Sequence, residues 1–188
     1  MTDVKLVQKG NPSLVYMILG LLYISDSHAY DLLKRLKDTF HQIWRPSQSQ
    51  LYVVLSKLEK NQYISSTVII QDNRPPKKHF TITEKGKESF LRWLESPTIR
   101  VKDMGSDFMA KLFFLSKISP NSMGCFMEKQ ATHLNISLER ILSIKGKSGD
   151  LFNKLVLSSK IHLITSWIEW INKIKMELPQ IIYESNPT

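Results

Sequence analysis

Residues 43–64, "IWRPSQSQLYVVLSKLEKNQYI", carry the pattern from which the fold can be predicted. Pro46 prevents a helix from running through this stretch and can start a new helix, which we expect to end near Asn61. Apolar residues recur at helical spacing at Leu51, Val54, Leu55 and Leu58. The intervening residues, on the opposite face, are Ser49, Tyr52, Val53, Ser56 and Lys60. The pattern predicts a helix with one buried face and one exposed face that is poor in acid and rich in hydrogen-bonding groups.

Two further helices are predicted before this stretch. Asn11 and Pro12 are typical of a helix N-terminus, and the helix that they start should run to about Ile24. Ser27 can cap a second helix, which should extend to about Phe40. Tyr30, Leu33 and either Leu36 or Lys37 fall at turn spacing along one face of this helix.

After this stretch the pattern changes from helix to strand. The runs "YISSTVIIQ" (63–71) and "HFTIT" (79–83) are rich in β-branched and aromatic residues and flank the turn-forming "DNRPPKK". They predict a β-hairpin with its tip near Asn73 to Pro76. Thr83 can cap a fourth helix, which Ser96 and Pro97 end. Three helices, a hairpin and a fourth helix make the order of a winged helix-turn-helix, so we predict a mainly α-helical protein with this domain over residues 1–96.

Residues 97–188 are predicted to form an α-helical dimerisation domain. A long helix should start at Pro120, and "GKSG" at 146–149 should separate it from the last helix. The last helix carries a heptad seam made of Leu157, Ile161, Ile164, Ile168, Ile171 and Leu178. A second apolar stripe beside this seam consists of Leu163, Trp167, Trp170 and Ile174.

Two stripes are more apolar surface than one packing partner covers. We therefore expect one stripe to pack within the subunit and the other against a second copy of the chain, with the seam as the candidate dimer interface. Burial of both stripes within a monomer is the alternative, and the pattern leaves open which stripe makes the dimer contact. A twofold dimer would suit a partner with its own twofold symmetry, such as an inverted repeat in DNA.

The composition favours a polyanionic partner. The 188 residues include 26 Lys and Arg against 17 Asp and Glu, which gives a formal net charge of +9 at pH 7. The excess is spread over both halves of the chain, so no basic tail accounts for it. A generally basic protein with no such partner is the alternative that charge alone leaves open.

The sequence carries no pattern typical of an enzyme. The five histidines are scattered, and the single cysteine, Cys125, can form no disulfide within the chain. No catalytic or metal-binding signature is present, so we expect no catalytic residues, no metal and no cofactor. No apolar run is long enough to span a membrane, and the lone cysteine suits a reducing cytoplasm, where we expect the protein to act.

Three segments resemble the PadR family of bacterial transcriptional regulators. They are "LGLLYISDSHAYDLLKRL", "LYVVLSKLEKNQYI" and "KKHFTITEKGKESFLRWL". The segment "SPTIRVKDMGSDFMAKLFFLSKISP" is similar to the longer, virulence-activator-like C-terminal type of this family. The resemblance implies a sequence-specific DNA-binding regulator, more often a repressor. One departure is Asn61, where the family usually has Gly; Asn tolerates the left-handed conformation expected there.

The residues expected to contact double-stranded DNA belong to the third helix and to the hairpin. Short polar side chains near the start of that helix can pair with base edges, and lysines can reach phosphates. The third-helix set is Arg45, Ser47, Gln48, Ser49, Gln50, Tyr52, Ser56, Lys57 and Lys60. The hairpin set is Arg74, Lys77 and Lys78. The role of Tyr52 at a phosphate is implied by the resemblance, and a plain solvated helix face is the alternative for the whole set.

The resemblance also implies a small hydrophobic or aromatic effector, whose binding would release the DNA. The candidate lining residues are Trp93, Phe108, Trp167 and Trp170, and ordinary core packing is the alternative for each of them. A winged helix that binds another protein instead of DNA is the alternative function. Such a module would expose Leu, Phe or Trp on the third helix, where this chain offers Tyr52 and Val53.

Overall fold

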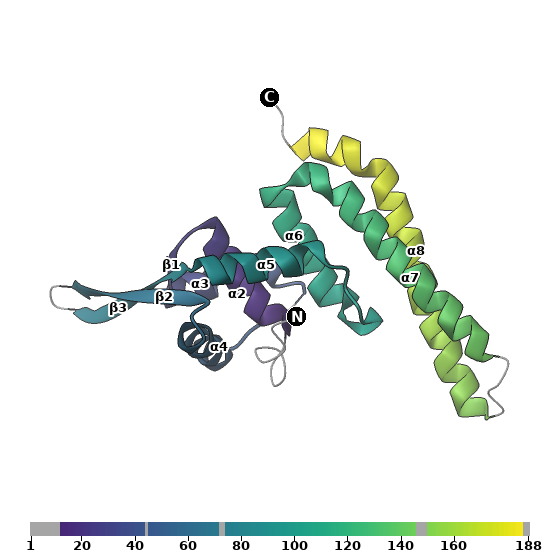
Figure 1. The fold of residues 1–188 in the computed structure, drawn as a ribbon, viewed down its shortest axis with the longest axis horizontal. Helices are drawn as coiled ribbons and strands as arrows, with labels where there is room; N and C mark the ends of the chain where they lie inside the picture. Colours follow the sequence, from purple (N-terminus) through teal and green to yellow (C-terminus); the bar gives the residue numbers. More distant parts are fainter. Residues whose placement is uncertain (1–11, 44, 72–73, 146–149, 186–188) are drawn as a thin grey trace. The chain divides into compact units, whose positions relative to one another are not determined.

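The computed structural model of the chain describes residues 12–43, 45–71, 74–145 and 150–185 (Figure 1). These residues divide into two compact units. The first unit comprises the residues up to Ser96 together with Gly105–Phe114, and the second comprises Pro97–Met104 and the residues from Leu115 onward. The first unit therefore includes one short segment, Gly105–Phe114, that lies after the predicted boundary at residue 96.

The first unit has the predicted helix and hairpin order. Its helices are α2 (Pro12–Ile24), α3 (Ala29–Phe40), α4 (Gln48–Lys60) and α5 (Glu84–Glu95). Its strands are β1 (Ser27–His28), β2 (Ile64–Gln71) and β3 (Arg74–Ile82), which form an antiparallel sheet in the order β1-β3-β2. Figure 1 shows the β2–β3 hairpin extending beyond the helices, as the wing of a winged helix-turn-helix does. The prediction of a mainly α-helical protein with a winged helix-turn-helix is confirmed.

The core of the first unit forms around α2. Met17, Ile18 and Leu19 are fully buried, and the apolar faces of the other helices close over them. Gly20 is needed here, because a Cβ at this position would lie 2.4 Å from the Phe114 ring and 2.6 Å from the Phe90 ring. The buried residues from α4 are Leu51, Leu55 and Leu58, as their spacing predicted, whereas Val54, the fourth residue of the predicted face, is half-buried.

The start of α3 differs from the prediction. Ser27 does not cap this helix, because Ser27 and His28 pair with Phe80 and His79 of β3 and form a strand. The helix begins at Ala29, and the residue at its N-cap position, His28, makes no side-chain cap hydrogen bond. The N-cap preference of Ser is a local signal, and pairing with a strand distant in the sequence overrides it.

Tyr30 is also placed differently from the prediction. Its side chain is 76% exposed, so it does not belong to the inner face of α3. The inner face consists of Leu32, Leu33, Leu36 and Phe40. This set begins two residues later than expected, and Tyr30 is therefore left at the surface near the start of the helix.

The end of α4 differs from the expectation for Asn61. Asn61 has φ −93° and is not left-handed, whereas the next residue, Gln62, has φ 63°. The Tyr63 N–H donates to the Leu58 carbonyl at 2.9 Å and the Gln62 N–H to the Glu59 carbonyl at 3.0 Å, which is a Schellman motif with Gln62 in the left-handed position. Asn61 contributes through its side-chain amide, which donates to the Lys57 carbonyl at 2.7 Å.

The hairpin has the predicted strands but a tighter turn. Gln71 pairs with Arg74, so Pro75 and Pro76 belong to β3 and not to the tip. Asn73 lies outside the described residues. The fourth predicted helix is confirmed as α5, and the hydroxyl of Thr83 accepts a hydrogen bond from the Gly86 N–H at 3.2 Å, as a capping residue does.

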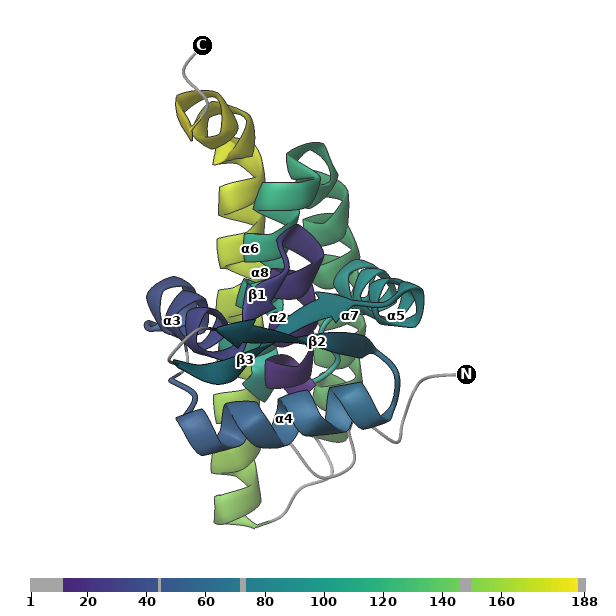
Figure 2. The same cartoon turned by 90° about the vertical axis from the view of Figure 1, so that its left-hand side faces the viewer.

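The second unit consists mainly of two long helices, α7 (Met123–Lys145) and α8 (Leu151–Ser185), which lie side by side (Figures 1 and 2). The shorter helices are η1 (Val101–Asp103), η2 (Met104–Phe108), α6 (Met109–Ile118) and η3 (Pro120–Ser122), of which η2 and α6 include residues of the first unit. The predicted break at 146–149 lies outside the described residues, although one helix ends and the next begins on either side of it. None of the helices in the described part of the chain is long and apolar enough to cross a membrane.

The heptad seam of α8 is partly buried within the single chain. Ile164, Ile171 and Leu178 are buried, whereas Leu157, Ile161 and Ile168 are half-buried. In the second stripe, Leu163 is exposed and Trp167, Trp170 and Ile174 are half-buried. Ile164, Ile171 and Leu178 therefore pack within the second unit, whereas the other three seam residues keep part of their surface exposed.

Candidate nucleic-acid interface

The start of α4 is fixed by a capping box. The Ser47 hydroxyl accepts a hydrogen bond from the Gln50 backbone N–H at 3.2 Å, and the Gln50 side-chain carbonyl accepts one from the Ser47 N–H at 3.0 Å. The Ser47 and Ser49 hydroxyls are also 3.0 Å apart. Ser47 and Gln50 therefore hold the helix start with groups that the sequence assigned to base contacts. Gln48 and Ser49 lie at the same end of α4 and are exposed.

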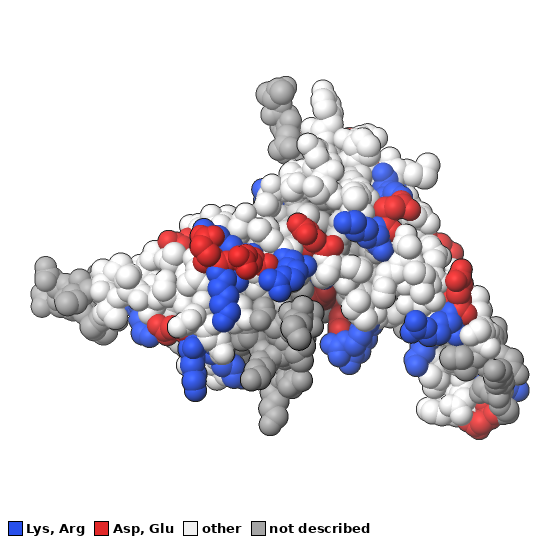
Figure 3. Space-filling view, in the orientation of Figure 1, with Lys and Arg blue, Asp and Glu red and all other residues white. Residues whose placement is uncertain are grey.

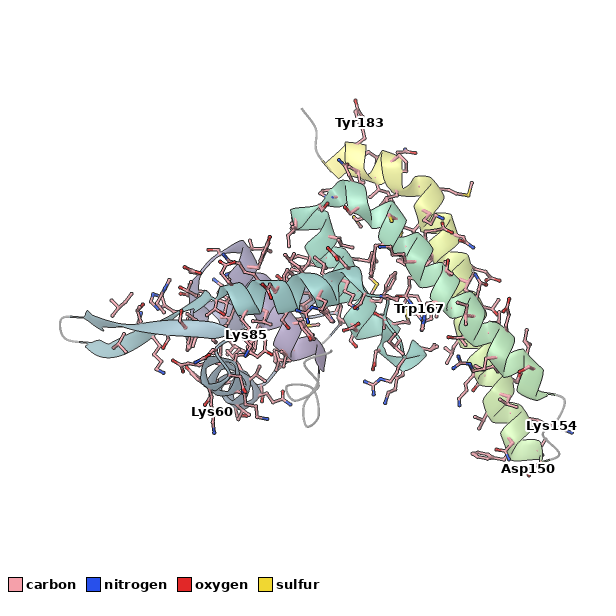
Figure 4. All side chains as sticks on the ribbon, viewed as in Figure 1. Lys60, Lys85, Asp150, Lys154, Trp167 and Tyr183 are labelled. Carbon is pink, nitrogen blue, oxygen red and sulfur yellow. The ribbon has the colours of Figure 1, made fainter. Side chains whose placement is uncertain are left out.

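The outer face of α4 is exposed along its whole length. Its exposed residues are Gln48, Ser49, Gln50, Tyr52, Val53, Ser56, Lys57 and Lys60. Figure 2 shows α4 below the sheet of the first unit. Figure 4 shows Lys60 projecting from α4 away from that sheet. The sequence-predicted residues of the helix thus share one accessible surface. Arg45 precedes this surface and is exposed, and its Nε donates to the His41 carbonyl at 3.4 Å.

The single acidic residue of α4, Glu59, is engaged by the wing. Its carboxylate accepts a hydrogen bond from the Ser66 hydroxyl and lies 3.1 Å from the Lys78 ammonium. The hydrogen bond from Ser66, together with the charge of Lys78, lowers the pKa of Glu59. Glu59 is therefore an anion that α4 directs toward β2 and β3, and its charge is matched by a lysine.

The two wing lysines differ in their surroundings. Lys78 is half exposed and is the partner of Glu59. Lys77 is exposed, and it pairs with Ile69 of the adjacent strand β2. The side chain of Arg74, the third wing cation of the prediction, lies outside the described residues. In Figure 3, several Lys and Arg side chains gather along the edge of the first unit where α4 and the wing lie.

A groove with a volume of about 650 Å³ lies between the start of α3, one side of α4 and strand β3. Its lining residues are His28, Ala29, Tyr30, Asp31, Tyr52, Leu55, Ser56, Glu59, Lys77, Lys78 and Phe80. The groove joins the predicted helix residues Tyr52 and Ser56 to the predicted wing residues. The lining residues that carry donors suited to phosphate oxygens are Tyr30, Tyr52, Ser56, Lys77 and Lys78. Asp31 and Glu59 bring two carboxylates to the same groove.

Tyr30 and His28 line this groove but were not among the predicted site residues. Tyr30 falls at turn spacing from Leu33, and this spacing gave no reason to place it in the interface. His28 is held by a contact of 3.2 Å between its Nδ1 and the Lys78 carbonyl and by an edge-on contact with the His79 ring. The only sequence signal for these two residues was the polar run "SDSHAYD" before and at the start of α3. This run did not show whether Tyr30 points into the core or toward solvent.

The four aromatic residues predicted to line an effector pocket fall in different units. Trp93 and Phe108 belong to the first unit, where both are buried, and the Trp93 ring stacks on the Tyr16 ring with centroids 4.9 Å apart. Trp167 and Trp170 belong to the second unit, where their rings meet edge to face at 5.8 Å. The grouping of these four residues into one pocket stays a prediction. Within the described ranges, no group of three or more His, Cys, Asp or Glu is placed to hold a metal ion.

Comparison with known proteins gives matches over both parts of the chain. Residues 18–92 match the transcriptional regulator PadR-like family, and residues 105–178 match the virulence activator alpha C-terminal family. The negative transcriptional regulator PadR of Bacillus subtilis is 27% identical over 172 residues, which cover 86% of this chain and 94% of that protein. A probable transcriptional regulator of Mycobacterium tuberculosis is 29% identical over 85 residues, which cover 45% of each chain.

Among solved structures, B. subtilis PadR in complex with operator DNA has a TM-score of 0.46 and 26% identity, with 88% of this chain and 97% of that chain covered. The first family match lies over the winged helix-turn-helix, and the second lies over the helices after it. The chain belongs to the PadR-like family of transcriptional regulators and has a C-terminal part of the virulence-activator type.

Proposed function

We propose that this chain is a sequence-specific DNA-binding repressor that acts as a dimer on an inverted-repeat operator. The observation that carries the proposal is the outer face of α4, which is exposed, poor in acid and continuous with a cationic wing. Repression is supported by the B. subtilis relative, which is named as a negative regulator. The site of action is the cytoplasm, where the operator DNA of a bacterium lies.

In this proposal, α4 enters the major groove and offers Gln48 and Ser49 to base edges. Tyr52, Ser56 and Lys77 hold one sugar–phosphate strand in the groove beside α4, together with Tyr30. Lys57 and Lys60 contribute charge along the helix. The capping groups Ser47 and Gln50 act chiefly by fixing the helix start, so a change in either would alter the pose of α4.

The dimer contact is proposed to use apolar residues that the second unit leaves exposed. Leu151, Phe152 and Leu155, at the start of α8, are 71%, 68% and 61% exposed. A patch of this kind at the surface is typical of an interface. Two of the three half-buried seam residues, Leu157 and Ile161, follow the patch along the same helix. A small aromatic or hydrophobic effector that contacts Trp167 and Trp170 could then change the spacing of the two DNA-reading units.

The proposal is tested by footprinting the protein on the DNA upstream of its own gene. The expected result is protection of an inverted repeat, with half-sites separated by about one helical turn or a multiple of it. Tyr52→Ala and Lys77→Ala should abolish the footprint while the folded dimer is retained. A protein that protects no sequence there, or that protects DNA equally well with both substitutions, would favour the alternative of a protein-binding winged helix.

A further inference from the structure

Glu59 occupies an unexpected place for an acidic residue. It lies in the last turn of α4 and lines the groove that we propose for a DNA strand. A carboxylate there would repel phosphate if it were free, and Coulomb repulsion alone predicts that its removal strengthens DNA binding. The contacts of Glu59 indicate a different role.

The carboxylate of Glu59 spans both strands of the wing. One oxygen accepts the hydrogen bond from the Ser66 hydroxyl on β2, and the two oxygens lie 3.1 and 3.3 Å from the Lys78 ammonium on β3. Ser66 pairs with Phe80, and Lys78 lies two residues before Phe80 on the same strand. Ser66, Lys78 and the buried Phe80 therefore share the face of the sheet that is turned toward the helices.

We infer that Glu59 is a positioning residue, which ties the wing to α4 so that the two DNA-reading elements keep one relative orientation. This inference rests on the proposed DNA-binding function. Beyond this bridge, the wing is a two-stranded hairpin that extends past the helices (Figure 1), and an isolated hairpin is at best marginally stable. A link from the end of α4 to both strands restrains the wing before it meets DNA, which reduces the ordering entropy lost on binding.

The bridge also gives the two wing lysines different tasks. Lys78 is the structural cation, because its charge is already matched by Glu59. Lys77 is exposed and lines the same groove, so it is the wing lysine that neutralises a phosphate. Lys77→Ala should therefore reduce the magnitude of the salt slope of log affinity by roughly 0.9 per subunit, whereas Lys78→Ala should weaken binding with less change in that slope.

The test is a double-mutant cycle on DNA affinity at fixed salt, with the operator fragment that the wild-type protein protects. If Glu59 positions the wing, Glu59→Ala should weaken binding by about fivefold, although it removes a negative charge from the DNA face. Lys78→Ala should weaken binding to a similar extent, and the double variant should be no weaker than either single variant. Glu59→Gln keeps an acceptor for Ser66 and should fall between wild type and Glu59→Ala.

Glu84→Ala is the matched control. Glu84 also pairs with a lysine of the first unit, Lys87 at 2.6 Å, but it does not line the groove, so its removal should not weaken binding. Amide hydrogen exchange in residues 64–71 and 77–82 should be faster in Glu59→Ala than in the control, because the wing has lost its restraint.

The inference is overturned if Glu59→Ala binds as tightly as wild type or tighter. It is also overturned if the double variant is weaker by the product of the two single effects, about 25-fold, since additive effects describe independent residues. Failure of the proposed function is a separate outcome. In that case the wild-type protein itself shows no salt-dependent binding to any duplex.

Discussion

The indole nitrogen of Trp93 donates a hydrogen bond of 2.8 Å to Oδ1 of Asp107, while Oδ2 of the same carboxylate lies 3.1 Å from the ammonium of Lys111. Lys111 is 1% exposed, and its ammonium also donates to the Ser96 carbonyl at 2.8 Å and lies 5.0 Å from the centre of the Trp93 ring. Burial lowers the pKa of Lys111, and Asp107 opposes that shift. The cluster ties the end of α5 to the short segment that returns to the first unit.

Lys111→Met should destabilise the protein by about 3 kcal/mol, because it leaves a partly buried carboxylate without its cation. The free energy of unfolding in urea measures the effect. Lys173→Met is the control, since Lys173 is 72% exposed and lies 4.0 Å from Glu177, and it should change stability by less than about 0.5 kcal/mol. Equal stabilities for the two variants would mean that the buried cluster is not a stabilising contact.

Gln62→Gly should stabilise the protein by about 0.5–1 kcal/mol, because Gln62 holds a left-handed φ of 63° that glycine adopts without strain. The same change at the preceding residue, Asn61→Gly, should destabilise it, since Asn61 has an ordinary φ and would lose its hydrogen bond to Lys57. Thermal unfolding of the pair measures both signs. If Asn61→Gly stabilised the protein instead, Asn61 would be the left-handed residue, as the sequence pattern predicted.

Tyr30→Phe should weaken DNA binding by about fivefold without a loss of stability, because it removes one hydroxyl from the groove and leaves the exposed ring in place. Tyr183→Phe is the control, since Tyr183 is 80% exposed in the second unit (Figure 4). Fluorescence anisotropy with labelled operator DNA compares the two. Unchanged affinity in Tyr30→Phe would remove Tyr30 from the interface.

Phe152→Asp combined with Leu155→Asp should give folded monomers with weak DNA binding, because both side chains are exposed and their loss leaves the packing of α7 and α8 intact. Ile164→Asp should instead unfold the second unit, because Ile164 is 1% exposed within the chain. Sedimentation equilibrium with circular dichroism separates these outcomes. A double variant that is still dimeric would show that another surface joins the subunits.

The parts of the fold that the sequence predicted correctly depend on neighbours along the chain. The spacing of Leu51, Leu55 and Leu58 located the buried face of α4, and Thr83 marked the start of α5, because helical periodicity and capping are local effects. The sequence did not reveal β1, since Ser27 pairs with a strand that lies far away in the chain. It also placed the left-handed residue at Asn61, because residue preference favours Asn over Gln there.

The candidate site shows the same division. The outer residues of α4 were predicted from their period, and they do share one exposed surface. The capping role of Ser47 and Gln50 competes with their predicted role at bases, and both roles use the same polar groups. The partners of Glu59 come from two strands that only the folded wing brings together, so its isolated position in the sequence gave no sign of the bridge.

The most direct test of the proposed function is the salt dependence of affinity for operator DNA. Four exposed cations per subunit, Arg45, Lys57, Lys60 and Lys77, are proposed to neutralise phosphates. A dimer that uses all of them should give a slope of log affinity against log salt of roughly −7. A steep slope of this size is the predicted result, and an affinity that does not change between low and high salt would contradict the proposal that α4 and the wing bind DNA.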